Sequence, residues 1–129
     1  VRALAKRLID TLSIKVSGPG QIAGTLSGGN QQKVVFGKWL ATQPDILILD
    51  EPTRGLDLSA KADILRLAVE LADEGAAILL ISSELEELMR VSHRYLIVRK
   101  RVVVGELPGT ASEAGLIAAL SDGTTQEAA

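Results

Sequence analysis

Two uninterrupted apolar runs constrain the fold of this chain more than any other feature of its sequence. Ile46-Leu47-Ile48-Leu49 has the pattern of a strand that is buried on both faces of a parallel sheet, and residues 76–81 predict a second buried strand. Between them, apolar residues recur at helical spacing from about residue 59 to 73, and Gly75 is placed to end that helix. Strand, helix and strand in this order predict an α/β domain with at least a partly parallel sheet.

The other expected elements follow from the same kind of pattern. Apolar residues at helical spacing predict an amphipathic helix over the first dozen residues, and Gly18-Pro19-Gly20 interrupts regular structure. In the hairpin expected near the C-terminal end, Arg101 stands in the turn, so either this residue is strained in the usual turn geometry or the turn is rebuilt. The remaining expected elements are helices over 27–42 and 114–120, hairpin strands over 95–98 and 102–104, and a frayed tail over 124–129.

Composition excludes several classes of protein. The 129 residues suffice for one compact domain, and 14 Lys and Arg against 16 Asp and Glu give a net charge of −2, without the basic excess of a nucleic-acid-binding domain. The absence of cysteine excludes a disulfide framework and a thiolate zinc site, and no uncharged apolar run is long enough to span a bilayer. The chain opens at Val1 directly in a helical pattern, which we interpret as a fragment of a longer protein.

The segment Leu26-Ser27-Gly28-Gly29 precedes a predicted helix and is the first candidate site. A serine N-cap followed by two glycines leaves backbone N–H groups approachable at the positive end of the helix dipole, which suits a phosphate. The same residues also fit a plain serine cap with glycines in a tight turn. By itself the segment leaves both interpretations open.

The second candidate site is Asp50-Glu51-Pro52, directly after the first apolar run. Two carboxylates then stand at the end of a buried strand, where ligands of open α/β sheets usually bind. One carboxylate there can hold Mg²⁺ through water, and the other can orient or deprotonate an attacking water. A charged strand end followed by a proline turn is the alternative.

The order of these segments makes the chain resemble the ATP-binding cassette family. Leu-Ser-Gly-Gly, a helix, an apolar strand that ends in Asp-Glu-Pro-Thr, and then Gly-Leu-Asp correspond there to the signature motif, the Walker B strand with its catalytic glutamate, and the D-loop. The resemblance covers about residues 1–107, and residues 108–129 are expected to form an extension with a short helix. Within the family, segments 27–33, 51–57 and 82–85 are similar to the C-terminal cassette of bacterial monosaccharide importers of the ribose and xylose type.

The resemblance implies a fold and a set of site residues. The implied fold is that of a P-loop nucleotide triphosphatase, present in part: some of the helical subdomain and the Walker B half of the parallel sheet. Asp50 would bind Mg²⁺ through water, Glu51 would polarise the hydrolytic water, and Asp57 would couple the two sites at a cassette dimer interface. The residues implied to contact the ATP of a partner cassette are Ser27, Gly28, Gly29, Asn30 and Gln31.

The sequence also departs from the family pattern. The P-loop, Gly-x-x-x-x-Gly-Lys-[Ser/Thr], is absent from the 129 residues, so we expect the isolated chain to be inactive and to bind Mg-ATP negligibly. At the position of the family's switch histidine stands Ser83, which we interpret as a helix N-cap that forms a capping box with Glu86. A hydroxyl does not replace that imidazole, so this cassette's own ATP site is expected to be impaired. His93 lies too late to substitute and is interpreted as a surface or structural residue, whereas Arg54 fits a solvated loop charge and a contact across the dimer equally well.

The function that the resemblance implies is ATP-driven sugar import, with ATP and Mg²⁺ as cofactors. The expected partners are a second cassette, membrane permease subunits and, indirectly, a sugar-binding protein, with no nucleic acid. The expected location is the cytoplasmic face of the inner membrane, without entry into the bilayer. The alternatives are an ATPase of translation or repair that has no permease, and a non-catalytic interaction module. The sequence does not identify the sugar.

Overall fold

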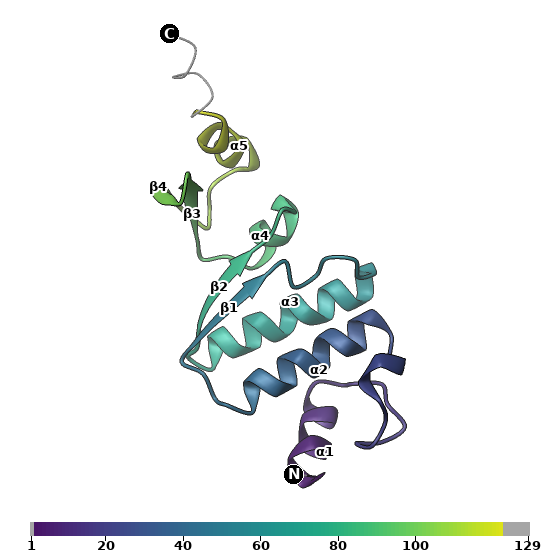
Figure 1. Ribbon diagram of the computed structural model, residues 1–129. Coiled ribbons are helices and arrows are strands. Elements are labelled where there is room, and N and C mark those ends of the chain that lie inside the picture. The colour runs from purple at the N-terminus through teal and green to yellow at the C-terminus, as the bar shows by residue number, and fades with distance from the viewer. Residues whose placement is uncertain (1, 123–129) are drawn as a thin grey trace. The chain divides into compact units, whose positions relative to one another are not determined.

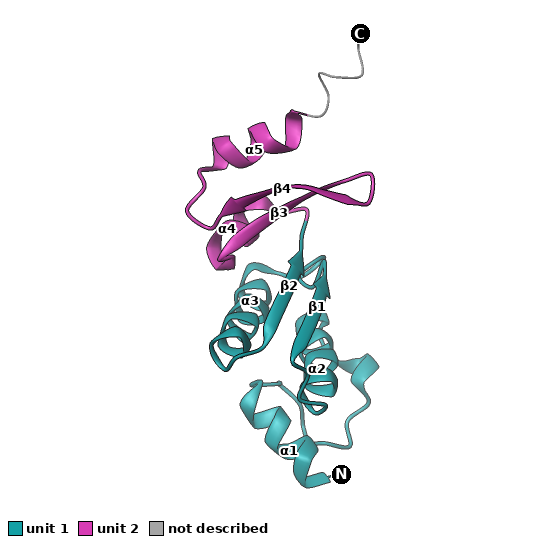
Figure 2. Cartoon of the chain, turned by 90° about the vertical axis from the view of Figure 1, so that its left-hand side faces the viewer, with its two compact units in different colours: residues 1–82 teal, residues 83–129 magenta. Residues whose placement is uncertain are grey.

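The computed structural model describes residues 2–122 of the chain, which divide into two compact units between residues 82 and 83 (Figure 2). The predicted tail over 124–129 lies outside the described residues, and the expected boundary after residue 107 stays a prediction. The elements of the first unit are α1 (Arg2–Thr11), a 3₁₀ turn (Ala23–Thr25), α2 (Gly28–Leu40), β1 (Ile46–Asp50), α3 (Leu58–Asp73) and β2 (Ala77–Ile81). Those of the second unit are α4 (Leu85–Val91), β3 (Arg94–Arg99), β4 (Val102–Pro108) and α5 (Glu113–Ser121).

The strands β1 and β2 form the parallel pair that the apolar runs predict (Figure 1). Ile46 pairs with Ala77 and Asp50 with Ile81, and α3 is the crossover that joins the two strands. A crossover helix is the usual way to join adjacent parallel strands, because they need a long connection. The α/β class expected from the sequence is therefore confirmed for the first unit.

The prediction that the first strand is buried on both faces is wrong for the described residues. Leu47 and Leu49 are buried, whereas Ile46 and Ile48 are 68% and 63% exposed. The expected burial of β2 is wrong as well, because Leu79 and Ile81 are 43% and 45% exposed. Successive side chains of a strand point to opposite faces, and in residues 2–122 helices of the first unit cover only one of them.

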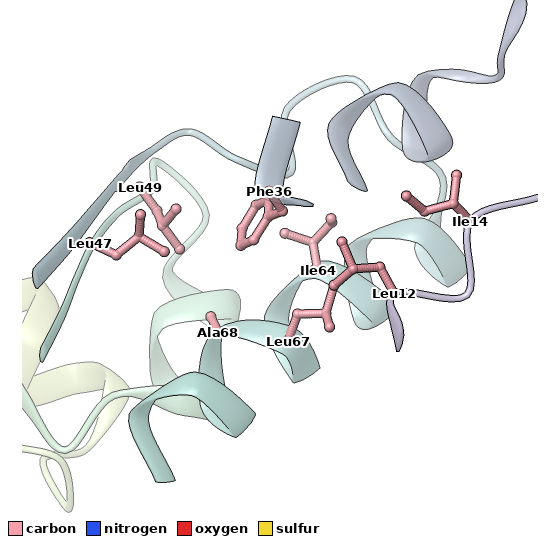
Figure 3. Close-up of a cluster of buried hydrophobic side chains, with 8 residues drawn as sticks. All are labelled: Leu12, Ile14, Phe36, Leu47, Leu49, Ile64, Leu67 and Ala68. Atoms are coloured by element: carbon pink, nitrogen blue, oxygen red, sulfur yellow. The ribbon is translucent and has the colours of Figure 1, made fainter. Parts of the chain in front are cut away.

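The core of the first unit lies between that covered face and the helices (Figure 3). Phe36 of α2 and Ile64 of α3 are 3% and 0% exposed, and both belong to the same cluster as the inward-facing leucines of β1. Leu12 and Ile14, just after α1, extend the cluster, which is completed by Leu67 and Ala68. Burial of these aliphatic side chains holds α2, α3 and β1 together.

The helix α3 has well-defined ends. At its start, the Asp57 side chain accepts a hydrogen bond from the N–H of Ala60 at 2.8 Å, so Asp57 is the N-cap. At its end, Gly75 has a φ of +107°, its N–H donates to the Ala72 carbonyl, and the Ala76 N–H donates to the Leu71 carbonyl. This pair of hydrogen bonds is a Schellman motif, and it confirms that Gly75 ends the helix.

In the second unit, β3 and β4 form the expected antiparallel hairpin, with Arg99 paired to Val102. The two turn residues, Lys100 and Arg101, have φ values of +49° and +68°, as a type I′ turn requires. Of the two alternatives for Arg101, the structure has the strained residue in the usual turn geometry. The helix α5, expected over 114–120, begins at Glu113 and is capped by Ser112, whose Oγ accepts from the Gly115 N–H.

The capping box predicted at Ser83 and Glu86 is wrong. The N-cap of α4 is Glu84, one residue further along, and Glu86 lies in the first turn. Because the helix begins at Leu85, Ser83 lies one residue before the cap position that the capping box requires. Within residues 2–122, no helix combines the length and apolar character needed to cross a membrane.

Candidate functional site

The N-terminal end of α2 carries the first candidate segment. Ser27 occupies the N-cap position with extended backbone angles, and the helical ladder starts with the Gln31 N–H, which donates to the Ser27 carbonyl at 2.8 Å. The side chain of Ser27 makes no capping bond, however, so the expected serine cap is correct in position and wrong in its hydrogen bond. Ser27 and Gly28 are exposed at the end of the helix where backbone N–H groups concentrate.

The two glycines of the segment differ in what surrounds them. A Cβ on Gly29 would lie 2.6 Å from the Cβ of Ala60 in α3, closer than real Cβ contacts come. A Cβ on Gly28 would lie 3.4 Å from a methyl group of Leu56, which is near ordinary contact. The close approach at Gly29 brings the N-terminal ends of α2 and α3 together, and the two helices run side by side (Figure 1).

An ion pair joins the same two helices one turn further along. Lys33 is 6% exposed, and its Nζ donates to Asp63 Oδ2 at 2.7 Å and to the Ser13 carbonyl at 3.4 Å. The hydrogen bond from Lys33 is the main reason that the pKa of Asp63 lies below its ordinary value. The positive charges of Lys33, Arg66 and Lys15 lower this pKa further, whereas desolvation by burial raises it. A buried ammonium needs such a partner, because an uncompensated charge in the interior is costly.

The side chains of Asn30 and Gln31 bond within the segment itself. Asn30 Oδ1 accepts from the backbone N–H of Lys15 at 2.9 Å, and Asn30 Nδ2 donates to Ser27 Oγ at 2.8 Å. Gln31 Nε2 donates to the Leu26 carbonyl at 2.8 Å. Both residues therefore shape the loop before α2, and their expected contact with a nucleotide stays a prediction.

The second candidate segment follows β1. Asp50 is the last residue of the strand and is exposed, and the Glu51 N–H continues the ladder by donating to the Ile81 carbonyl at 2.9 Å. Glu51 has a φ of +47°, a left-handed conformation that a glutamate adopts only when its surroundings impose it. Such strained residues concentrate at functional sites, which makes Glu51 a candidate for chemistry.

The remaining sequence-predicted residues lie in different settings. The Asp57 carboxylate caps α3, which is a structural role. Its expected role at a dimer interface stays a prediction. Arg54 is exposed, its N–H donating to the Glu51 carbonyl at 3.2 Å. His93 is exposed, as expected for a surface residue, and Ser83 is exposed at the start of the second unit.

The contacts described bring the Ser27 segment together with the start of α3, where Asp57 lies. The sequence reasoning missed Lys33 and Asp63, although Lys33 shares a helix face with Phe36 and Gly37, which are buried. A cation on the apolar face of an amphipathic helix was the available signal. In the part of the chain that the structure describes, no three His, Cys, Asp or Glu side chains cluster to hold a metal ion.

An apolar groove runs along β1 beside α2. Its volume is about 510 Å³, and Trp39, Pro44 and Asp50 are among the residues that line it. Ile46 and Ile48 also line this groove with their exposed side chains, so it coincides with the uncovered face of β1.

Comparison with protein families and curated sequences finds that the chain is similar to ABC transporter proteins. The family model described as ABC transporter matches residues 3–54. The chain is 46% identical over 125 residues to a ribose import ATP-binding protein of Streptomyces avermitilis, covering 97% of this chain and 24% of that protein. It is 50% identical over 98 residues to a galactose/methyl galactoside import ATP-binding protein of Escherichia coli K12, covering 76% of this chain and 19% of that protein.

Solved structures agree on the fold. The crystal structure of the ADP conformation of an ATP-binding cassette of an ABC transporter matches with a TM-score of 0.75 and 25% sequence identity, over 97% of this chain and 48% of that chain. The chain therefore spans about half of a solved cassette and about a quarter of the length of the ribose import relative that it matches.

Proposed function

This chain belongs to the ATP-binding cassette family, and on that basis we propose that it is part of the ATPase subunit of a sugar importer. In that subunit, a second cassette holds the phosphates of a bound ATP, and the segment Ser27–Gln31 completes the site around that ATP. The observation that carries the proposal is the exposed N-terminal end of α2. There the Ser27 side chain makes no capping hydrogen bond, and Gly29 packs closely on Ala60. The sugar-import names of the relatives support the transport role.

The chemistry of the α2 end suits a terminal phosphate. The first N–H groups of an α-helix have no partner within the helix, and the helix dipole places positive potential there. The end of α3 lies beside it and adds a second dipole, although the Asp57 carboxylate offsets part of that potential at its own cap. An anionic oxygen at this end accepts hydrogen bonds from backbone N–H groups and from the Ser27 hydroxyl.

Asp50 and Glu51 serve the chain's own cassette in this proposal. Mg²⁺ is usually held by one or two carboxylates together with waters and substrate phosphates, and an exposed carboxylate at the end of β1 fits that pattern. Bound Mg²⁺ would neutralise charge that develops on the phosphates. Glu51 orients and polarises the attacking water, whereas Ser83 offers no imidazole in the second unit, so we propose that this site hydrolyses ATP weakly.

The partners and location in this proposal follow the import relatives. The chain works with a second cassette and with permease subunits, at the cytoplasmic face of the membrane, and a sugar-binding protein delivers the substrate to the permease. The 129 residues alone contain no Gly-x-x-x-x-Gly-Lys-[Ser/Thr] segment, so we propose that they bind Mg-ATP negligibly in isolation. Calorimetry that measures micromolar binding to the isolated chain would contradict this.

Ser27→Arg in the full-length protein tests the role of the α2 end. The larger, charged side chain should prevent the partner cassette from closing on its ATP, so sugar uptake in vesicles should be lost and ATP hydrolysis should fall with it. Ser17→Arg is the matched control, because Ser17 is an exposed serine in the loop before the 3₁₀ turn. Unchanged uptake and hydrolysis in Ser27→Arg would contradict the proposal. If Ser27→Arg loses ATP hydrolysis but the wild-type protein supports no sugar uptake either, only the transport role in the proposal would be contradicted.

A further inference from the structure

The amide of Asn30 has an orientation that its partners fix. The backbone N–H of Lys15 is only a donor, so the atom of Asn30 that faces it at 2.9 Å must be the oxygen. The amide nitrogen therefore faces Ser27 Oγ, at 2.8 Å. Asn30 thus links the segment after α1 to the serine at the start of α2 through one half-buried side chain.

This arrangement determines what the Ser27 hydroxyl can do. A serine oxygen that accepts from Asn30 Nδ2 cannot direct its own proton to that nitrogen, because the amide nitrogen is a donor only. Accepting one hydrogen bond also strengthens the O–H as a donor to another group. At an N-cap the same oxygen would ordinarily accept from the N–H of Gly29 or Asn30, and here it does not.

We propose that Asn30 is a positioning residue that holds Ser27 Oγ away from the helix cap. It thereby presents the Ser27 O–H, together with the first N–H groups of α2, to the terminal phosphate oxygens of a nucleotide. This inference rests on the proposed function of the α2 end. In it, the side chain of Asn30 acts on the nucleotide through Ser27 and need not touch the phosphate itself.

Asn30→Asp in the full-length transporter tests the proposal with a nearly isosteric change. The carboxylate keeps an acceptor for the Lys15 N–H, so the fold is retained, but it also accepts the Ser27 proton and turns that hydroxyl inward. We expect kcat for ATP hydrolysis to fall by roughly 10- to 100-fold, the range expected when one hydrogen bond to a charged group is lost. The ratio of the variant's kcat to that of the wild type should rise as the pH is lowered, because the introduced carboxyl group donates again once it is protonated.

A double-mutant cycle with Ser27→Ala separates this route from a direct charge effect. In the Ser27→Ala background, Asn30→Asp should change kcat by less than about twofold, because the group through which it acts is gone. Gln31→Glu is the matched control: it places the same charge one residue along, its amide bonds to the Leu26 carbonyl, and its effect should be equal in both backgrounds. If Asn30→Asp yields no folded protein, Asn30→Ala goes through the same cycle.

The outcomes distinguish the role of Asn30 from the proposed function of the α2 end. A large effect of Ser27→Ala with a non-additive Asn30→Asp supports the positioning role. A large effect of Ser27→Ala with a fully additive Asn30→Asp overturns the role of Asn30 and leaves the proposed function intact. Normal hydrolysis in Ser27→Ala overturns the proposed function of the segment, and the role of Asn30 with it.

Discussion

Replacing Gly29 by alanine should separate the N-terminal ends of α2 and α3. The new Cβ would lie 2.6 Å from the Cβ of Ala60, whereas carbon atoms in favourable contact lie about 3.5–4.0 Å apart. The Ala60 atom belongs to a short side chain on a helix and has no rotamer by which to move away. The two helices must therefore shift apart by roughly 1 Å at this point.

The expected cost follows from two opposing effects. Overpacking of a close contact typically costs about 1–3 kcal/mol, and the replacement of a helical glycine by alanine returns about 0.5–1 kcal/mol. We therefore expect Gly29→Ala to lower the free energy of unfolding, by up to about 2.5 kcal/mol. Gly28→Ala is the matched control, because its Cβ would meet Leu56 at 3.4 Å and the change should be neutral or slightly stabilising.

Urea unfolding of the chain measures these differences. Trp39, the single tryptophan, lies near the end of α2 and reports on that helix by fluorescence, with circular dichroism as a second probe. Ala60→Gly removes the opposing methyl group, so Gly29→Ala made in that background should no longer destabilise the chain. The reasoning is refuted if Gly29→Ala and Gly28→Ala are equally stable, or if Ala60→Gly fails to rescue Gly29→Ala.

Three further measurements test other contacts. The pKa of Asp63 is lowered chiefly by its hydrogen bond from Lys33. The stability that this pair contributes is therefore complete above the ordinary pKa of 3.8 and is lost as the pH falls from there through the lower folded-state pKa. Acid unfolding of Asp63→Asn should lack this component, and an acid unfolding curve equal to that of the wild type would contradict the role of the pair. Arg101→Gly should stabilise the β3–β4 hairpin by about 0.5–1 kcal/mol, because glycine adopts a φ of +68° without strain, and amide hydrogen exchange in the hairpin should slow. Leu49→Ala should lower the free energy of unfolding in urea by about 2–4 kcal/mol and Ile48→Ala by less than about 0.5 kcal/mol, because Leu49 is 8% exposed and Ile48 is 63% exposed. Equal losses in the two variants would contradict the finding that only one face of β1 is covered.

Much of the local structure could be predicted from sequence. The apolar run at residues 46–49, the helical spacing before Asp73 and the position of Gly75 predicted strand, helix and helix end close to where the structure has them. Each of these depends on residues within a few positions of one another, and φ preferences and hydrophobic spacing act at that range.

The errors arose where a feature depends on what lies opposite. The apolar run was expected to be buried on both faces, but burial depends on which elements cover each face, and the described residues cover only one. Ser83 and Glu86 have the spacing of a capping box, yet α4 starts one residue too late for it. Ser27 stands at the cap position, and a neighbouring amide uses its oxygen instead.

The sequence by itself determined the order of strand and helix, the helix end at Gly75, and the motif order by which the chain resembles the ATP-binding cassette family. The tertiary structure decided between a strained Arg101 and a rebuilt hairpin turn. The tertiary structure decided that Gly29 is needed for contact with Ala60, that Lys33 pairs with Asp63, and that Asn30 connects Lys15 to Ser27. These partners are separated by 15 to 31 positions in the sequence, except that Asn30 is close to Ser27. Local preferences act within about one helical turn, whereas contacts at such separations exist only once α2 packs against α3 and the segment after α1.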